Sequence, residues 1–272
     1  MPEADLALLE QAAREAGEIA LRFWRAGPAH WDKGGGAGPV SEADLAVNAH
    51  LEALLRKQRP DYGWLSEESP DDPARLGAAR CFIVDPIDGT RAFLAGEEGF
   101  SHSLAIAEGE RVIAAIVHLP ARNETYLARA DGPALLNGRP LAPAEHPIEG
   151  ARVLAGKPSL DPALWRGRPP PIRREFRPSL AWRLCLVAEG RFHAALSTRP
   201  AWEWDIAAGS LIAARAGCAA SELSGRPLRF NAPRPLVAGL VVAPPALHGQ
   251  ILDALGPPPP AGSGTTVAGG KG

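Results

Sequence analysis

The residues best suited to catalysis or metal binding in this 272-residue sequence are Asp85 and Asp88, in the hexapeptide Asp-Pro-Ile-Asp-Gly-Thr at residues 85–90. The hexapeptide follows an apolar run at residues 81–84, which predicts a buried strand that places both carboxylates at one spot. Two like charges about 4 Å apart repel by roughly 4 kcal/mol at an effective dielectric constant of about 20. Such a pair therefore either stays partly protonated or binds a divalent cation. Taken alone, the hexapeptide is also compatible with a solvated turn.

Two further acidic sites strengthen the metal-binding interpretation. Glu67 and Glu68 form a pair upstream, and Asp205 stands at the predicted start of a helix, in the stretch Trp-Asp-Ile-Ala-Ala-Gly at residues 204–209. Each has an ordinary interpretation alone, because acidic pairs in loops are usually solvated and an aspartate before a helix is usually an N-cap. None of these stretches contains His or Cys, and ligation by oxygen alone favours Mg²⁺ or Mn²⁺ over zinc.

Three stretches resemble, in chain order, the signature motifs of the inositol monophosphatase superfamily of magnesium-dependent, lithium-sensitive phosphatases. They are Ser-Glu-Glu-Ser at residues 66–69, the hexapeptide at 85–90 and the stretch at 204–209. The resemblance extends over residues 6–255. It implies an α+β fold, a layered α/β/α/β/α sandwich. It also implies hydrolysis of a small-molecule phosphate monoester with two or more Mg²⁺ ions per site, Mn²⁺ being the alternative metal.

The resemblance assigns metal ligands residue by residue. Glu67, Asp85 and the carbonyl group of Ile87 would hold a first metal ion. Asp85, Asp88 and Asp205 would hold a second, so that Asp85 bridges the two. The implied mechanism is in-line attack of a metal-activated water on the phosphate, with the second metal stabilising the leaving oxygen.

The resemblance also implies catalytic and phosphate-binding residues. Thr90 would orient the attacking water, with Asp44 behind it, and Glu67 is the third candidate catalytic residue. Asp44 fits equally well as the acidic partner in a helix-capping box. The backbone amides of Gly89 and Thr90 would receive a phosphate oxygen. Lys33 matches a family lysine near phosphate, although a solvated surface lysine is the ordinary alternative.

The choice of substrate depends on the C-terminal half. Residues 181–190 resemble the pattern of bacterial 3′(2′),5′-bisphosphate nucleotidases, with Arg183 as a candidate substrate-binding cation in place of lysine. Ser197 and Thr198 stand where animal inositol monophosphatases have a glutamate that contacts inositol. We therefore expect hydrolysis of 3′-phosphoadenosine 5′-phosphate to AMP and phosphate, with inositol-1-monophosphatase as the alternative. Fructose-1,6-bisphosphatase is less favoured, as is a non-catalytic metal- or phosphate-binding regulator, which would have lost at least one motif residue.

Composition excludes several other classes of function. The net charge of −2 gives no global positive field for nucleic acid or an anionic membrane, so we expect neither as a partner. The N-terminus lacks a signal-peptide pattern, and no apolar run approaches the roughly 18 residues needed to span a bilayer. Three widely spaced cysteines fit a reducing compartment, so the expected location is cytoplasmic. The sequence leaves open whether the protein forms a homodimer.

The elements that must position these residues follow from periodicity. Apolar residues at steps of three and four predict a helix through most of the first 24 residues, and Ser41 begins a second that ends near Arg59. A third helix should run from Asp205 to Gly217. Strand candidates with turn signals between them lie at residues 62–65, 81–84, 103–107, 112–118 and 124–129, followed by an Asn-Gly hairpin at 137–138.

The predicted organisation has two subdomains. Residues 1–135 form an N-terminal α+β subdomain with the main metal-binding motifs, and residues 136–255 form a C-terminal α/β subdomain with the third motif. Residues 165–178 are an Arg- and Pro-rich connector, after which ordered structure resumes at 184–196. Residues 256–272, with four consecutive prolines, form a disordered tail. The site should lie between the subdomains, because Asp205 is the one ligand from the second half.

Overall fold

A seven-stranded sheet is the largest element of the computed structural model, which describes residues 2–34 and 38–256. Its strand order is β3-β4-β5-β6-β7-β8-β9, and only the β3–β4 pair is parallel. Positive φ angles at Gly109 and at Asn137-Gly138 form the tight hairpin turns that the sequence predicts. The strands are β3 (Gly63–Ser66), β4 (Arg80–Asp88), β5 (Ser101–Glu108), β6 (Arg111–Leu119), β7 (Glu124–Arg129), β8 (Leu135–Leu136) and β9 (Arg139–Pro140).

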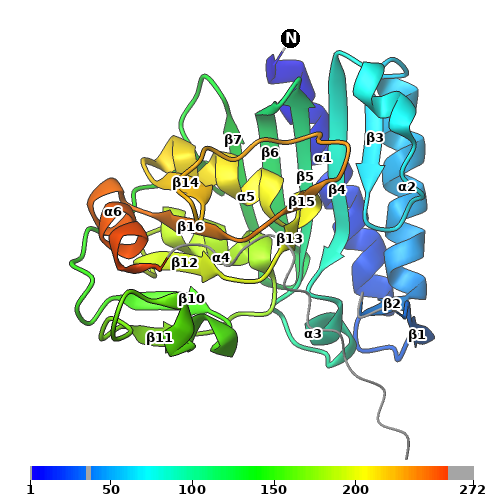
Figure 1. Cartoon of the computed structure of the whole chain (residues 1–272). Coiled ribbons are helices and arrows are strands. Elements are labelled where there is room, and N and C mark those ends of the chain that lie inside the picture. The colour runs from blue at the N-terminus through cyan, green and yellow to red at the C-terminus, as the bar shows by residue number, and fades with distance from the viewer. Residues whose placement is uncertain (1, 35–37, 257–272) are drawn as a thin grey trace, which may run out of the picture.

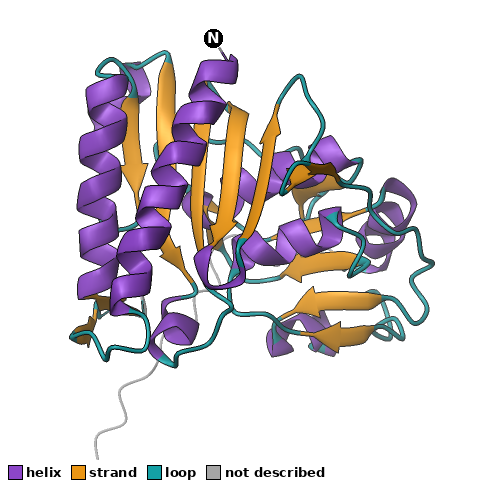
Figure 2. Ribbon diagram, turned by 180° about the vertical axis from the view of Figure 1, so that it is seen from behind, coloured by secondary structure: helices purple, strands orange, loops and turns teal. Residues whose placement is uncertain are grey.

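Two long helices, α1 (Pro2–Phe23) and α2 (Glu42–Gln58), cover one face of this sheet (Figure 2). Successive side chains of β4 point to opposite faces of the sheet, so this strand contributes to two hydrophobic cores. Phe82 and Val84 pack under these helices, whereas Cys81 and Ile83 belong to the core on the opposite face. The first helix was predicted from its apolar periodicity and the second from its helix-start signal at Ser41, and both are confirmed.

A second, five-stranded sheet completes the layers, with the order β11-β10-β12-β16-β14. Two helices, α4 (Leu180–Ala188) and α5 (Glu203–Ala216), share one core with both sheets, and α6 (Pro245–Ala254) packs on the outer face (Figure 1). The chain thus forms the α/β/α/β/α sandwich that the sequence predicts. The strands are β10 (Arg152–Ala155), β11 (Arg173–Glu175), β12 (Ala194–Ser197), β14 (Ala219–Glu222) and β16 (Leu240–Ala243).

Short elements lie where the layers meet. They are the β1 (His30–Asp32) and β2 (Pro39–Ser41) pair, helix α3 (Thr90–Leu94), and the β13 (Ala201–Trp202) and β15 (Leu236–Val237) pair. The β13 strand leads directly into α5. None of the helices in the described part of the chain combines the length and apolar character that crossing a bilayer requires.

The structure corrects the interpretation of residues 165–178 as a plain connector. Its Arg173–Glu175 stretch is strand β11, which pairs in parallel with β10, and Trp165 is buried. The helix expected from Asp205 begins two residues earlier, at Glu203, and ends at Gly217 in the left-handed conformation as predicted. Residues 257–272 of the predicted tail lie outside the described residues. Gly256 is described and donates a backbone hydrogen bond of 2.8 Å to Leu164.

Candidate metal centre

Three carboxylates from distant parts of the chain meet at one end of β4. Glu67 follows the last residue of β3, Asp85 lies within β4, and Asp205 lies in the first turn of α5. One oxygen atom of each lies within 4.8 Å of the other two. Since β3 and β4 are parallel neighbours, their carboxyl ends share an edge of the sheet, and the Glu67 N–H donates to Val84 O across it at 3.2 Å.

An irregularity in β4 directs the motif residues toward this edge. Asp85 pairs with Ser103, yet Asp88 pairs with Ser101, so the register shifts between the two aspartates. Gly89 then ends the strand with a φ of 96°, a left-handed conformation that favours glycine. An added Cβ there would also lie 3.1 Å from the Gly99 carbonyl oxygen. The turn therefore requires glycine at position 89.

The carboxylates line a cavity of about 290 Å³ together with the other residues of the hexapeptide that follow Asp85, apart from Pro86. Among the described residues, Asp44, Lys33 and Arg183 line no part of it. The structure therefore gathers most of the predicted site into one space. The lining residues are Gly38, Pro39, Glu67, Asp85, Ile87, Asp88, Gly89, Thr90, Arg91, Phe176, Pro178 and Asp205.

The electrostatics of the cavity fit a divalent cation. Asp85 is 1% exposed, and its buried Oδ1 has no hydrogen-bond partner among the described residues. Burial raises the pKa of Asp85 well above its ordinary value, and the nearby Glu67, Asp88 and Asp205 carboxylates raise it further. Burial and the same kind of repulsion also raise the pKa of Asp205. An oxygen-only cluster with an unpartnered buried carboxylate oxygen matches what Mg²⁺ requires.

Asp88 is held differently from the other carboxylates. Its Oδ2 accepts hydrogen bonds of 2.7 Å from Ser179 Oγ and 2.7 Å from the Ala181 N–H, at the start of α4. Asp88 lines the cavity but lies outside the group of three whose oxygens are mutually within 4.8 Å. Sequence reasoning missed Ser179, although the Pro178-Ser179 pair before an apolar run is a helix N-cap signal that could have identified it.

Asp44 makes both of the contacts expected of it, through different oxygens. Its Oδ2 accepts hydrogen bonds from the Ser41 N–H at 2.9 Å and from Ser41 Oγ at 2.6 Å, which completes the capping box. Thr90 Oγ1 lies 3.2 Å from Asp44 Oδ1 and 3.1 Å from the Ile87 carbonyl oxygen. Burial raises the pKa of the Asp44 carboxyl. The capping and catalytic interpretations are therefore compatible.

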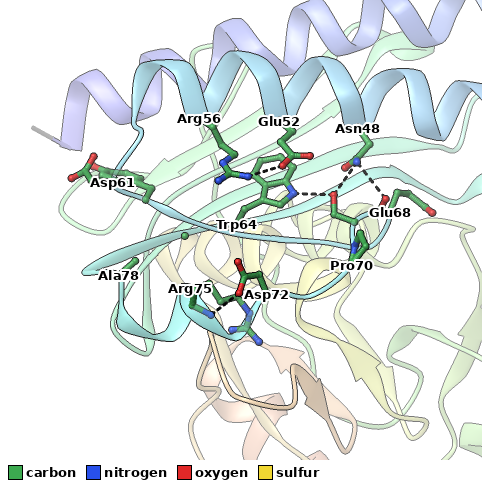
Figure 3. Close-up of a pocket in the computed structure, with 14 residues that line it drawn as sticks. Asn48, Glu52, Arg56, Asp61, Trp64, Glu68, Pro70, Asp72, Arg75 and Ala78 are labelled. Carbon is green, nitrogen blue, oxygen red and sulfur yellow. Dashed lines mark hydrogen bonds and ion pairs between the residues drawn. The ribbon is translucent and has the colours of Figure 1, made fainter.

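Lys33 lies beside the metal-ligand candidates rather than on the cavity wall. Its Nζ forms ion pairs with Glu67 at 2.6 Å and with Glu68 at 2.8 Å. Behind this loop, Asn48 donates to the Glu68 carbonyl and to Ser69 Oγ, and Trp64 Nε1 also donates to Ser69 Oγ (Figure 3). These contacts fix the loop that carries Glu67. Contact of Lys33 with phosphate stays a prediction.

Arg183 lines a neighbouring cavity of about 200 Å³, which shares Phe176 with the metal cavity. Its Nε donates to the Arg177 carbonyl at 2.5 Å and its Nη2 to the Pro178 carbonyl at 3.2 Å, while its guanidinium lies 4.3 Å from the Phe176 ring centroid. Arg183 therefore braces the segment between the two cavities. The other lining residues are Gly156, Pro158, Ser159, Ser197, Thr198 and Arg199.

Two tryptophans near the acidic motifs, Trp182 and Trp202, differ in how far their rings are exposed for stacking against a base. Trp182 is 5% exposed and packs in the core, so it offers no free face. Trp202 is 41% exposed and stacks on Trp204, with ring centroids 4.9 Å apart. Of these two rings, the Trp202 ring alone is exposed enough to stack against a ligand.

Comparisons with known proteins agree with this geometry. A 3′-phosphoadenosine 5′-phosphate phosphatase from Mycobacterium leprae is 33% identical over 260 residues, covering 88% of each chain. An inositol-1-monophosphatase from Rhizobium meliloti is 34% identical over 242 residues, covering 85% of this chain and 84% of its own. The solved IMPase of Thermotoga maritima superposes with a TM-score of 0.78 at 26% identity, covering 93% of this chain and 96% of its own.

The family assignment comes from the whole described chain rather than from the motifs alone. The model of the Inositol monophosphatase family matches residues 1–256. That match includes all three acidic stretches and both sheets. The chain therefore belongs to the inositol monophosphatase family, whose members are phosphatases that act on phosphate monoesters.

Proposed function

We propose that this protein is a magnesium-dependent 3′(2′),5′-bisphosphate nucleotidase that hydrolyses 3′-phosphoadenosine 5′-phosphate to AMP and phosphate. The observation that supports this substrate is the second cavity, which shares the lining residue Phe176 with the carboxylate cavity and is lined by two arginines, Arg183 and Arg199. A substrate with two phosphates needs one anion-binding site away from the reacting phosphate, and arginine is well suited to that task.

The residues that would hold Mg²⁺ are the acidic residues of the cavity and one backbone carbonyl. Glu67, Asp85 and Asp205 form the core of the site, with Asp88 and the Ile87 carbonyl completing it. The chemistry that a divalent cation supplies in such a site is polarisation of phosphate oxygens and a lowered pKa of water. The Asp85 and Asp88 carboxylates are buried, at 1% and 7% exposure, whereas the cavity itself opens to solvent.

The chain's own residues orient the reactants. Thr90 Oγ1 lies within reach of Asp44 and the Ile87 carbonyl, so its hydroxyl can accept from the attacking water while it donates to one of them. Glu67 borders the same space and is the third candidate catalytic group. The amides of Gly89 and Thr90 would bind a phosphate oxygen. Burial raises the pKa of Glu67, and the ion pair with Lys33 would oppose that rise and favour the ionised carboxylate.

Substrate preference provides the test. We expect kcat/KM to be highest for 3′-phosphoadenosine 5′-phosphate when it is compared with inositol 1-phosphate and fructose 1,6-bisphosphate. Arg199→Ala should lower kcat/KM for the nucleotide by roughly 10- to 100-fold, the value of a charge-assisted hydrogen bond. It should leave inositol 1-phosphate nearly unchanged. Arg183→Ala is a poorer probe, because it also frees the segment at residues 177–178.

The matched control is Arg168→Ala, which removes an exposed arginine that lines neither cavity. Equal losses on all three substrates in the Arg199 variant would contradict a role in binding the second phosphate. A tenfold or greater preference of the unmodified protein for inositol 1-phosphate would refute the nucleotidase assignment.

Inositol-1-monophosphatase is the second candidate, and one observation favours it. Ser159 Oγ and Thr198 Oγ1 lie 3.2 Å apart in the second cavity, where paired hydroxyls could bind a polyol. The substrate comparison separates the two functions directly.

A further inference from the structure

A short backbone segment, Asn231-Ala232, lies between a buried glutamate and a buried arginine. Glu203 accepts hydrogen bonds from both of its N–H groups, at 2.5 Å from Asn231 and 3.0 Å from Ala232. Arg75 binds the other side of the segment, with Nη1 donating to Asn231 Oδ1 at 2.6 Å and Nη2 donating to the Ala232 carbonyl at 2.9 Å. Asp71 completes the arginine's partners at 2.6 Å and 3.0 Å. We call this arrangement the Arg75–Glu203 clamp.

The two charged side chains at the centre of the clamp, Arg75 and Glu203, are buried and hydrogen-bonded. The Arg75 side chain is 1% exposed and Glu203 is 1% exposed. Buried charges are tolerated when their hydrogen bonds are satisfied, as they are here, and removing one partner is costly. Asn231 has a φ of 58°, so the segment is held in a left-handed conformation that few residues adopt. These features give the clamp a single defined geometry.

The clamp connects the two chain segments whose carboxylates meet in the metal cavity. Glu203 is the first residue of α5, in the same turn as Asp205. Arg75 lies in the short 3₁₀ helix Pro73–Gly77, whose backbone packs on Gly63 at the start of β3. A Cβ on Gly63 would lie 2.8 Å from the Arg75 Cβ, so the two elements touch directly. Glu67 follows the other end of that four-residue strand.

We propose that Arg75 and Glu203 are positioning residues, which hold the Glu67 and Asp205 carboxylates at the spacing required to share a divalent cation. This inference rests on the metal site of the proposed function, not on its substrate. The clamp residues do not line the metal cavity. Their effect passes through two rigid elements, β3 and the first turn of α5, so its signature is metal affinity at equilibrium rather than the chemistry of the reaction.

The test measures metal binding to the full chain without substrate. Mn²⁺ binding is followed by electron paramagnetic resonance and Mg²⁺ binding by calorimetry, in the unmodified protein and in Glu203→Gln and Arg75→Met. We expect the dissociation constant for either ion to rise by roughly 10- to 100-fold, as for loss of other groups that orient metal ligands. Arg75→Lys, which keeps the charge, should recover part of this loss. At saturating Mg²⁺, kcat should return toward that of the unmodified protein.

The matched control is Asp5→Asn. Asp5 is a buried carboxylate that accepts from Arg59 at 2.9 Å and from Arg80 at 3.0 Å, at the end of β4 away from the metal cavity. It should lower the melting temperature and leave metal affinity unchanged. The proposal is overturned if Glu203→Gln and Arg75→Met behave like this control.

A milder variant covers the case in which these proteins do not fold. Asn231→Gly suits the positive φ and removes the side chain whose Oδ1 accepts from Arg75, while the backbone N–H and carbonyl groups of the segment remain. It should still weaken Mn²⁺ binding severalfold, and unchanged binding would contradict the proposal. If the unmodified protein itself fails to bind Mn²⁺ or Mg²⁺, the metal site is wrong. If it binds and the variants bind equally well, only the inference about the clamp is wrong.

Discussion

Ser179 Oγ donates a 2.7 Å hydrogen bond to Asp88 Oδ2, which links the first turn of α4 to a motif residue that lies 91 positions earlier in the chain. The same Oγ accepts from the Trp182 N–H at 2.9 Å and so caps α4. One hydroxyl group thus fixes both the helix start and the orientation of the Asp88 carboxylate. Its other neighbour, Ser101 Oγ, lies 3.0 Å away.

Removal of this hydroxyl should affect catalysis and stability separately. Ser179→Ala removes the side-chain hydrogen bond to Asp88 and leaves it the backbone N–H donors of α4. We therefore expect kcat to fall about tenfold and the free energy of unfolding to fall by about 1 kcal/mol from the lost cap. Steady-state kinetics and urea denaturation measure the two effects. Ser221→Ala, which removes another buried serine from β14, should cost stability alone. Equal kcat in both variants would contradict a role for Ser179 at the site.

Loss of the Asp205 charge should separate activity from stability. Asp205→Asn removes a proposed metal ligand, so kcat should fall by orders of magnitude. In the presence of chelator, however, the variant should melt at the same temperature as the unmodified protein or higher. The reason is that the mutual repulsion which raises the pKa of Asp85 and Asp205 is relieved, while an asparagine oxygen can still accept from the Trp202 N–H. A large fall in melting temperature under chelator would argue against this.

The Thr90 hydroxyl gives a sharper test of the catalytic assignment. Thr90→Val keeps the shape of the side chain but removes the group that contacts Asp44 and the Ile87 carbonyl. We expect kcat to fall by about 100-fold or more, within the range for loss of a proton-handling group, with Mn²⁺ affinity unchanged. Thr90→Ser retains the hydroxyl and should retain most of the activity. Loss of metal binding in Thr90→Val would instead place Thr90 among the ligands.

The buried histidines predict a pH dependence of stability. His118 stacks on His102 in the core, and burial lowers the pKa of His118 to about 4. Between about pH 6.5 and pH 4 the unfolded chain binds a proton that the folded protein does not, so this histidine makes stability fall as the pH falls. His118→Asn should reduce that slope by up to about 1.4 kcal/mol per pH unit. Urea unfolding at several pH values in the presence of chelator measures this slope in the two proteins. Identical slopes would show that His118 is protonated in the folded protein as readily as in the unfolded chain.

The sequence predicted what local patterns determine. Helix α1 and the strands of the first sheet follow from periodicity, and the acidic motif residues follow from the chemistry of clustered carboxylates. These signals are carried by neighbouring residues. The gathering of Glu67, Asp85 and Asp205 followed from the family resemblance rather than from spacing.

Long-range pairing explains what was missed. Arg173–Glu175 has the composition of a loop, and only its parallel pairing with β10 makes it a strand. Arg75 reaches Asn231 across 156 positions, so no local pattern indicates their contact. The Lys33 ion pairs with Glu67 and Glu68 likewise depend on where the β1–β2 pair folds back. Secondary structure is encoded mainly by local sequence, whereas the long-range partners of these polar side chains are determined by the tertiary structure.

The meeting of Glu67 and Asp205 also sets an order of events during synthesis. During synthesis, Glu67, Asp85 and Thr90 leave the ribosome long before Asp205 and before Ser179, the N-cap of α4 that orients Asp88. An early nascent chain can form most of the first sheet, but it holds an incomplete set of carboxylates that repel one another. We therefore expect phosphatase activity only after α5 has docked, with a divalent cation binding at that step and linking the two halves of the new chain.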